Sequence, residues 1–307
     1  MLDMDVSIIM PAYNAEKYIK KAIKGIMAQQ FLGTYELLIA DDCSSDSTRQ
    51  ILKEYEIQYS GTVKVIYNVD NLGCSANSIQ LCQLAQGKYL AFCDSDDIWT
   101  DPNKLQLQFD FLEKNVDYGM VCSNANIIDE KDEVIRFAEV NTGTDDCKDL
   151  QFESLIRKHE DVYNSSIMMR RDLYYQMLKD CTWYIDNKCL FDTVWVYYCS
   201  YHSKVLLMHK PLISFRSLEN SDSHSTDVNK RLMVDRRYYS MKVQFILQNN
   251  IPIDEQMSIL LAEYDYLRRN SWYLGEQSVR NSKAYKVGRN IIDPLKKICN
   301  FLKGNNS

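Results

Sequence analysis

Three aspartates, Asp94, Asp96 and Asp97, lie within four positions, directly after the apolar run YLAFC. Carboxylates this close together repel one another unless a positive charge lies among them. Magnesium and manganese prefer oxygen ligands, and magnesium sites commonly combine one or two carboxylates with the phosphates of a substrate. The stretch DSDD, which includes Ser95, therefore predicts a divalent cation that carries a diphosphate.

A second acidic pair, Asp41 and Asp42, follows another apolar run, YELLIA. A single pair of this kind more often caps a helix or forms a turn, and we interpret Asp46 and Asp101 in that way. The first and third apolar runs also end in polar segments, PAYN and YNVDNLG. If the runs are parallel strands, these ends meet at one edge of a sheet, where ligands bind in open α/β folds.

Other phosphate-binding classes are not supported by the sequence. It contains neither the G-x-x-x-x-G-K-[ST] loop of P-loop enzymes nor the G-x-G-x-x-G turn of dehydrogenases. A receiver domain would show a single central aspartate and a lysine after a later strand, which the stretch DSDD does not match.

The elements that must position these residues alternate in the first half of the chain. Apolar runs at 6–11, 35–42, 63–68 and 88–93 predict buried strands, and segments at 19–27, 45–59, 75–87 and 103–115 predict helices. We expect Asn14 to cap the first helix, Ser45 or Asp46 to lie near the start of the second, and Gly87 to end the third. Nearly continuous apolar strands alternating with helices indicate a mostly parallel sheet with helices on both faces.

The pattern changes in the second half. Two strands joined by a turn are expected at 119–129 and 133–137, and further strands at 165–171, 204–209 and 212–217. Segment 145–161 is expected to be a helix or a mobile segment, and 189–203 a long helix. We expect a flexible loop at 218–229 and helices from about residue 231 onward. We therefore expect a catalytic domain over 1–220, with halves at about 1–125 and 126–220, and a helical region over 231–303.

Composition points to a globular protein with a substantial core. The 307 residues are 46% hydrophobic and 25% charged, and the net charge of −6 disfavours nucleic-acid binding. Ten cysteines include no C-x-x-C pair, which disfavours a zinc ribbon or a thioredoxin-like motif. We expect no signal peptide, no transmembrane helix and a reduced, cytoplasmic compartment.

Four segments in succession carry a family resemblance: VSIIMPAYNAEKYIKKAIKGIMAQQF, ELLIADDCSSDST, NLGCSANSIQLCQLAQGKYLAFCDSDDIW and KLQLQFDFLE. The chain resembles the family 2 glycosyltransferases, closely over about 5–125 and more loosely over 160–216. The resemblance implies a GT-A (Rossmann-like) fold, a nucleotide-diphosphate sugar, which we take to be a UDP-sugar, Mn²⁺ or Mg²⁺, and inversion at the anomeric carbon.

The resemblance also assigns roles to residues. It places Pro11, Ala12, Tyr13 and Asn14 against the nucleoside, Asp42 on the base with Asp41 beside it, Asp94 and Ser95 on the ribose and diphosphate, and Asp96 or Asp97 on the metal.

The same resemblance implies that the general base is an aspartate opening the long helix after the sheet. Asp192 occupies that place, with Phe191 where a glutamate is common, and Asp186 is the alternative. An aspartate there could equally be a helix N-cap. Arg216 and His224 resemble a basic loop near the diphosphate, and we assign His224 to the metal. Leu218 breaks the usual Arg-x-His spacing, and a lone surface histidine is often only solvated.

The leading hypothesis is an enzyme that transfers a sugar to a glycan or lipid-linked hydroxyl in surface polysaccharide synthesis. The alternatives are a noncatalytic subunit that binds nucleotide sugars and, less favoured, a sugar nucleotidyltransferase. Segment 280–303 carries seven basic residues and one acidic one, together with an apolar stripe. Such a helix can lie on an anionic membrane or dock on its own protein. A homo-oligomer is a further alternative that the sequence does not decide.

Overall fold

The computed structural model describes residues 4–138, 146–158, 162–182, 191–218, 238, 241–249, 251–252, 256 and 259. The chain divides into two compact units, Met1–Leu155 with Glu160–Leu218, and Ile156–His159 with Glu219–Ser307. In the second unit the described residues include a helical stretch at 241–248. The loop expected at 218–229, apart from Leu218 itself, and the basic segment 280–303 lie outside the described residues.

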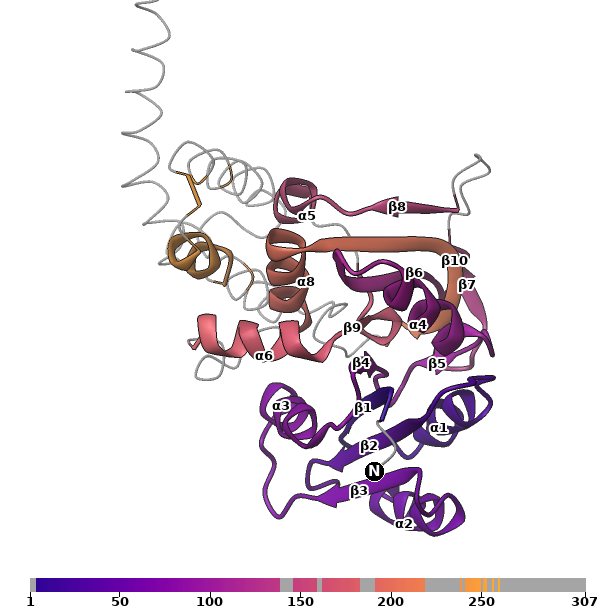
Figure 1. Ribbon diagram of the computed structural model, residues 1–307. Coiled ribbons are helices and arrows are strands. Elements are labelled where there is room, and N and C mark those ends of the chain that lie inside the picture. Colours follow the sequence, from indigo (N-terminus) through magenta and orange to yellow (C-terminus); the bar gives the residue numbers. More distant parts are fainter. Residues whose placement is uncertain are drawn as a thin grey trace, which may run out of the picture. The chain divides into compact units, whose positions relative to one another are not determined.

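The first unit is built on a sheet of ten strands (Figure 1). Its main order is β3-β2-β1-β4-β9-β6-β10-β5, with β7 beside β6 and β8 beside β10. The bounds are β1 Val6–Ala12, β2 Tyr35–Asp41, β3 Val63–Tyr67, β4 Tyr89–Phe92, β5 Ile98–Trp99, β6 Tyr118–Ile128, β7 Val134–Arg136, β8 Cys147–Asp149, β9 Met168–Arg170 and β10 Lys204–Arg216.

The direction of the strands follows from their pairing. β3, β2, β1 and β4 are parallel, as the sequence predicts, and β6 is parallel to β10. β9 is antiparallel to both β4 and β6, so β6 and β10 run in the same direction as the first group. All the long strands therefore end at the same edge of the sheet, and only the short strands β5, β7, β8 and β9 run the other way.

Helices cover both faces of this sheet. In Figure 1, α1, α2 and α4 lie on one side, and α3, α6 and α8 lie on the other. The bounds are α1 Ile19–Met27, α2 Thr48–Gln58, α3 Cys74–Leu84, α4 Lys104–Lys114, α5 Phe152–Lys158, α6 Arg171–Asp180 and α8 Phe191–His202, with a 3₁₀ turn η1 at Asn164–Ser166. None of the described helices is both long enough and apolar enough to cross a membrane.

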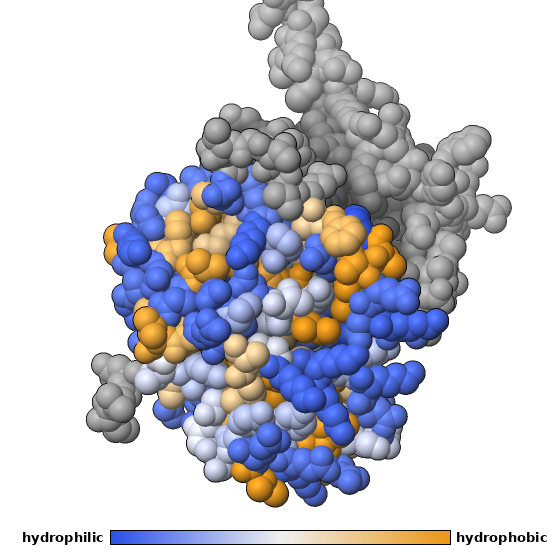
Figure 2. All heavy atoms as spheres, turned by 90° about the vertical axis from the view of Figure 1, so that its right-hand side faces the viewer, coloured by the Kyte–Doolittle hydropathy of each residue, from blue (hydrophilic) through white to orange (hydrophobic). Residues whose placement is uncertain are grey.

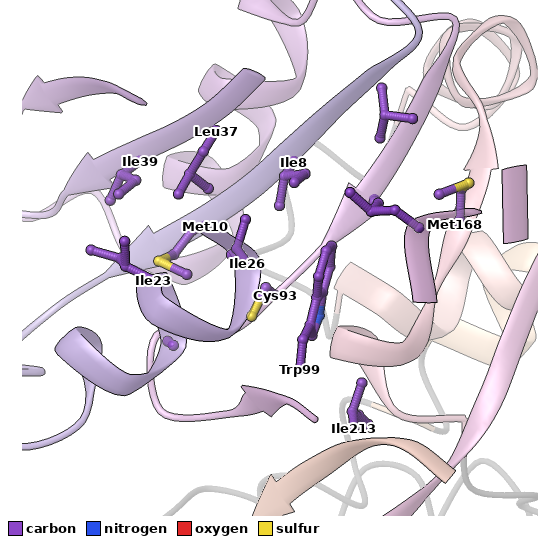
Figure 3. Packing of buried hydrophobic residues seen from close by; sticks show 14 of the residues in the cluster. Ile8, Met10, Ile23, Ile26, Leu37, Ile39, Cys93, Trp99, Met168 and Ile213 are labelled. Atoms are coloured by element: carbon purple, nitrogen blue, oxygen red, sulfur yellow. The ribbon is translucent and has the colours of Figure 1, made fainter. Parts of the chain in front are cut away.

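One hydrophobic core joins the two halves of the sheet (Figure 3). Side chains from the first strands and from α1 pack with residues that come much later in the chain; the cluster includes Ile8, Met10, Ile23, Ile26, Leu37, Ile39, Cys93, Trp99, Met168 and Ile213. On the face that carries α1, α2 and α4, apolar residues lie in small separate patches among hydrophilic ones (Figure 2).

Two predictions about helix ends, one for Gly87 and one for Asn14, were wrong. α3 ends at Leu84, so Gly87 does not terminate it; instead, a Cβ at Gly87 would lie 2.3 Å from the backbone nitrogen of Ser7. Gly87 is therefore required where the chain passes against β1. Asn14 does not cap α1, since Tyr18 holds the N-cap position and Asn14 adopts a positive φ of 47°.

The second half differs from the prediction at three places. Segment 145–161 begins with strand β8 before α5, and helix α6 follows β9 directly where only a strand was expected. The two strands predicted at 204–209 and 212–217 are one strand, β10. Pro211 lies inside it, at a point where the register with β6 shifts, because proline cannot donate a ladder hydrogen bond.

Candidate functional site

Strand ends bring the predicted residues to one edge of the sheet. β1 ends at Ala12, β2 at Asp41, β4 at Phe92 and β10 at Arg216. Backbone hydrogen bonds continue past these ends, from Asp42 to the Ala12 carbonyl and from Asn68 to the Asp41 carbonyl. The acidic loop, residues 94–97, leaves β4 at this edge, which is where the sequence predicts a site.

Asp97 is the most buried carboxylate of the acidic loop, with 1% of its surface exposed. Its Oδ2 accepts from the Ser165 hydroxyl at 2.5 Å and its Oδ1 from the Arg216 amide at 2.8 Å. Burial raises the pKa of Asp97 well above its ordinary value, and repulsion from Asp96 and Asp94 raises it further. With both oxygens already bonded inside the protein, Asp97 holds the loop to β10 rather than facing a ligand.

Asp96 lies in a different environment. It is half-buried, and among the described residues no other residue donates a hydrogen bond to its carboxylate. Burial raises the pKa of Asp96, and the charge of Arg216 opposes this effect. A desolvated carboxylate without a hydrogen-bonding partner is stabilised strongly by a cation. Between the two candidates, the geometry favours Asp96 over Asp97 as a metal ligand.

The segment that holds the acidic loop comes from the far half of the chain. Ser165 in η1 accepts from the Asp94 amide at 2.9 Å while donating to Asp97. Its neighbour Asn164 donates from Nδ2 to Asp94 Oδ1 at 2.8 Å. Sequence reasoning missed both residues, because a polar pair before a short strand carries no signal until the strand order places β9 beside β4.

A buried lysine lies behind this segment. Lys104 donates from Nζ to Gln108 Oε1 at 2.8 Å and lies 3.9 Å from the ring centre of Trp99. Gln108 donates to the Ser166 carbonyl, and the Trp99 indole donates to the Ser165 carbonyl. Burial lowers the pKa of Lys104 from 10.5 to about 7. This polar network, which the sequence analysis did not single out, sets the position of η1.

The second acidic pair is bonded within the protein. Asp42, 2% exposed, accepts from the amides of Leu72 at 2.8 Å and Gly73 at 2.9 Å, and from Asn68 Nδ2 at 3.2 Å. The Asp42 carboxylate therefore orders the loop before α3.

The other member of this pair, Asp41, is also buried. It accepts from Arg49 Nε at 2.8 Å in an ion pair. Arg49 is partly exposed and also lies 5.5 Å from the ring centre of Tyr67, a cation–π distance. Arg49 is a further residue at this edge that the sequence analysis did not name.

The first strand end offers one exposed side chain with binding chemistry. Pro11 and Ala12 are buried inside β1, whereas Tyr13 is 54% exposed and follows the strand directly. The Asn14 Oδ1 accepts from the Ser45 amide at 2.8 Å, so Asn14 joins this turn to the loop after β2. Of the four residues expected against the nucleoside, Tyr13 is therefore an aromatic residue that solvent or a ligand can reach.

Arg216 occupies a structural position in the described residues. It is 2% exposed; Nε donates to the Asp96 carbonyl, and its terminal nitrogens donate to the Asp129 carbonyl and the Asp132 carboxylate. Its guanidinium also lies 4.5 Å from the ring centre of Tyr18. Arg216 therefore supports the acidic loop through the Asp96 carbonyl, and its expected place near a diphosphate stays a prediction.

The predicted base lies at the start of a described helix. α8 begins at Phe191, so Asp192 is in its first turn, as expected. Trp195 of the same helix packs on Phe92 of β4 with ring centres 4.1 Å apart, which ties α8 to the strand that leads into the acidic loop. Asp186 and His224 lie outside the described residues.

Within the described part of the chain, no three histidine, cysteine, aspartate or glutamate side chains form a group that could hold a metal by themselves. The eight cysteines in this part form no disulfide bond with one another. A cation held partly by a substrate diphosphate needs only one or two protein carboxylates, and Asp96 is the carboxylate of the acidic loop that is chemically suited to that role.

The sequence from residue 7 to residue 191 matches the family described as Glycosyl transferase family 2. The chain belongs to this family. The match contains the ends of β1, β2 and β4, the acidic loop and η1, and it stops at the start of α8.

Curated relatives align with only part of their length. An uncharacterised protein of Mycobacterium tuberculosis is 40% identical over 36% of this chain and 32% of its own length. The putative teichuronic acid biosynthesis glycosyltransferase TuaG of Bacillus subtilis is 39% identical over 35% of this chain and 41% of its own. The Escherichia coli UDP-Glc:alpha-D-GlcNAc-diphosphoundecaprenol beta-1,3-glucosyltransferase WfgD is 36% identical over 45% of this chain and 52% of its own.

Solved structures extend the likeness over most of the chain. Staphylococcus aureus TarS (residues 1–349), solved in complex with UDP-GlcNAc, matches with a TM-score of 0.57 and 17% identity, covering 86% of this chain and 81% of TarS. The TM-score and coverage confirm the predicted GT-A fold, a mixed α/β sheet flanked by helices.

Proposed function

We propose that the protein is an inverting glycosyltransferase that uses a divalent cation and a UDP-sugar. The carrying observation is the Asp96 carboxylate, half-buried and without a hydrogen bond from another described residue, in the acidic loop where the long strands end. The relatives include WfgD, whose name specifies UDP-glucose, and TarS, which is similar in fold, has been solved with UDP-GlcNAc.

In the proposed mechanism, Asp96 would hold Mn²⁺ or Mg²⁺, and the cation would supply positive charge for the diphosphate leaving group. Tyr13 would stack its ring on the nucleobase, and its exposure at the end of β1 supports this role. Asp97, Ser165 and the buried Arg216 keep the acidic loop in one conformation before the substrate arrives. Preorganised geometry of this kind lowers the barrier because the reacting groups are already positioned.

Asp192 completes the proposal as the general base that removes the proton from the acceptor hydroxyl. Its position in the first turn of α8, on a helix packed against β4, supports this role. A positioned base typically contributes about 100-fold to 10,000-fold in rate. We expect Asp192→Asn to retain nucleotide binding and to lose turnover on that scale.

The test of the metal role compares two carboxylates of one loop. UDP binding is titrated by calorimetry with Mn²⁺ and with a chelator, for the wild type, Asp96→Asn and Asp97→Asn. We expect chelation to weaken binding by the wild type, and Asp96→Asn to bind weakly in both conditions. Asp97→Asn should still respond to Mn²⁺ if it folds, because its carboxylate faces the protein interior. Equal affinity with and without chelator in the wild type would refute the metal-bridged diphosphate.

The acceptor is proposed to be a hydroxyl of a glycan or of a lipid-linked sugar, at the cytoplasmic face of a membrane. Two observations support this proposal. The name of TuaG specifies teichuronic acid biosynthesis and that of WfgD a sugar linked to diphosphoundecaprenol, and segment 280–303 of this chain is basic. Co-sedimentation with anionic and neutral vesicles, for the whole chain and for a chain that ends at Asn290, tests the membrane contact. Salt-sensitive binding to anionic vesicles that is lost on truncation would support it, and equal recovery in the supernatant would contradict it.

Hydrolysis of the sugar donor separates an enzyme from a noncatalytic subunit. A catalytic protein should release UDP from a UDP-sugar slowly in the absence of acceptor, and faster once a suitable acceptor is added. Metal-dependent nucleotide binding with no release under either condition would favour the noncatalytic alternative.

A further inference from the structure

Asn164 is a buried residue with one half of its amide unused. The residue is 8% exposed, and Nδ2 donates to Asp94 Oδ1 at 2.8 Å. The Oδ1 atom of the same amide is buried and has no hydrogen-bond partner among the described residues. Because a buried polar atom without a partner loses its water without compensation, such an atom commonly marks a position that another molecule fills.

The orientation of this amide follows from its neighbour. Turning the Asn164 amide over would place its oxygen against the Asp94 carboxylate oxygen. Both atoms are acceptors, so that orientation would lose the hydrogen bond. Nearby hydroxyls are already used, since Ser165 donates to Asp97 and Ser166 donates to the Tyr163 carbonyl. The Asn164 oxygen therefore stays an open acceptor in the described structure.

The position of Asn164 points to a substrate rather than to packing. The Asn164 amide of η1 is bonded through its nitrogen to the Asp94 carboxylate of the acidic loop, so its oxygen is a second acceptor close to that carboxylate. Two adjacent acceptors suit two adjacent hydroxyl groups, each of which can donate one hydrogen bond. A nucleotide sugar carries such pairs both on its ribose and on its hexose.

We propose that Asn164 is a substrate-binding residue that accepts a hydrogen bond from a hydroxyl of the nucleotide sugar, next to a hydroxyl held by Asp94. The inference rests on the proposed function, because it takes a nucleotide sugar to be the ligand. It also gives η1, in the second half of the chain, two roles: Ser165 holds the acidic loop by hydrogen bonds, and Asn164 binds the substrate.

The test combines the removal of the side chain with the removal of the hydroxyl. Affinities are measured by calorimetry with Mn²⁺ for the wild type, Asn164→Ala and Asn164→Ser. The ribose arm uses UDP, 2′-deoxy-UDP and 3′-deoxy-UDP. The sugar arm uses UDP-glucose and its 2-deoxy, 3-deoxy and 4-deoxy forms. Asn164→Ser keeps a hydroxyl that can donate to Asp94, so it serves where Asn164→Ala does not fold.

We expect one deoxy probe to bind the wild type about tenfold more weakly than its parent, the scale of one hydrogen bond in a buried site. In both Asn164 variants that ratio should fall to about one, because both lack the amide oxygen, and the serine hydroxyl lies nearer to the backbone than that oxygen does. Asn115→Ala is the matched control: Asn115 is an asparagine at the end of α4 whose Nδ2 donates to the Phe111 carbonyl. It should keep the wild-type ratio even if its stability falls.

The outcomes separate the inference from the proposed function. If the wild type binds the parent probes and every deoxy ratio is the same in the wild type and the Asn164 variants, the inference is wrong while the proposed function stands. If the wild type binds none of the UDP probes, the proposed function fails and this inference fails with it. A ratio that changes only in the ribose arm or only in the sugar arm supports the inference and identifies the hydroxyl.

Discussion

Replacing Lys104 by methionine should make the stability of the protein less dependent on pH. Lys104 is buried, and burial lowers its pKa from 10.5 to about 7. Between these two values the unfolded chain holds a proton that the folded protein releases, so stability rises as pH rises. Below about pH 7 both states are protonated and the destabilisation is complete.

The size of the effect follows from the two pKa values. With 10.5 for the unfolded chain and about 7 for the folded protein, burying Lys104 lowers the free energy of unfolding by about 4 kcal/mol at pH 7 and about 2 kcal/mol at pH 9. The wild type should therefore gain about 2 kcal/mol over this range relative to Lys104→Met. The absolute stability of the variant also includes the lost hydrogen bond to Gln108, about 1 kcal/mol or more, and the lost contact with Trp99.

Urea unfolding at pH 7, 8 and 9 measures this difference in slope, which does not depend on those constant losses. Lys114→Met, on the exposed end of the same helix, is the matched control and should follow the wild type. If the wild type and Lys104→Met change in parallel across the range, Lys104 keeps its proton in the folded protein and the reasoning from burial is wrong.

Three further changes test how the strand ends are held. Asp42→Ala should lower the free energy of unfolding by at least about 2 kcal/mol, since the amides of Leu72 and Gly73 lose their acceptor. Hydrogen exchange at these two amides should become faster, and unchanged protection would contradict the role of Asp42 as their acceptor. Gly87→Ala should lower the thermal midpoint, because the new Cβ would lie 2.3 Å from the Ser7 nitrogen and overpacking costs about 1–3 kcal/mol; a midpoint equal to that of the wild type would show that β1 can shift. Ser165→Ala should weaken UDP binding by removing the hydroxyl that joins the Asp94 amide to Asp97, whereas Ser60→Ala, at an exposed position after α2, should leave binding unchanged. A normal affinity for Ser165→Ala would show that the acidic loop holds its shape without this bridge.

Local patterns were sufficient to predict the first half of the fold. The apolar runs that became β1, β2 and β4 are buried on both faces, so they can be recognised as continuous apolar segments without any tertiary information; β3, at the end of the strand order, is only partly buried. The parallel order of these strands follows from the helices between them. The acidic loop could be located for the same reason, because strand ends on one edge bring their polar residues together.

The individual roles of the acidic residues were decided by contacts between distant segments. Asp96 and Asp97 are adjacent and chemically identical, yet Asp97 is bonded to Ser165 and to the Arg216 backbone, while no other described residue donates to the Asp96 carboxylate. No spacing rule separates them, because the difference depends on which strand ends come to lie beside β4.

The sequence by itself determined the parallel core, the edge at which the site lies and the family resemblance, since each depends on residue types within one short segment. Tertiary structure alone decided that Arg216 is a buried support, that Lys104 lies behind the loop, and that Asn164 reaches Asp94. The physical reason is the antiparallel insertion of β9 between β4 and β6, which brings η1 to the acidic loop across about seventy residues of chain.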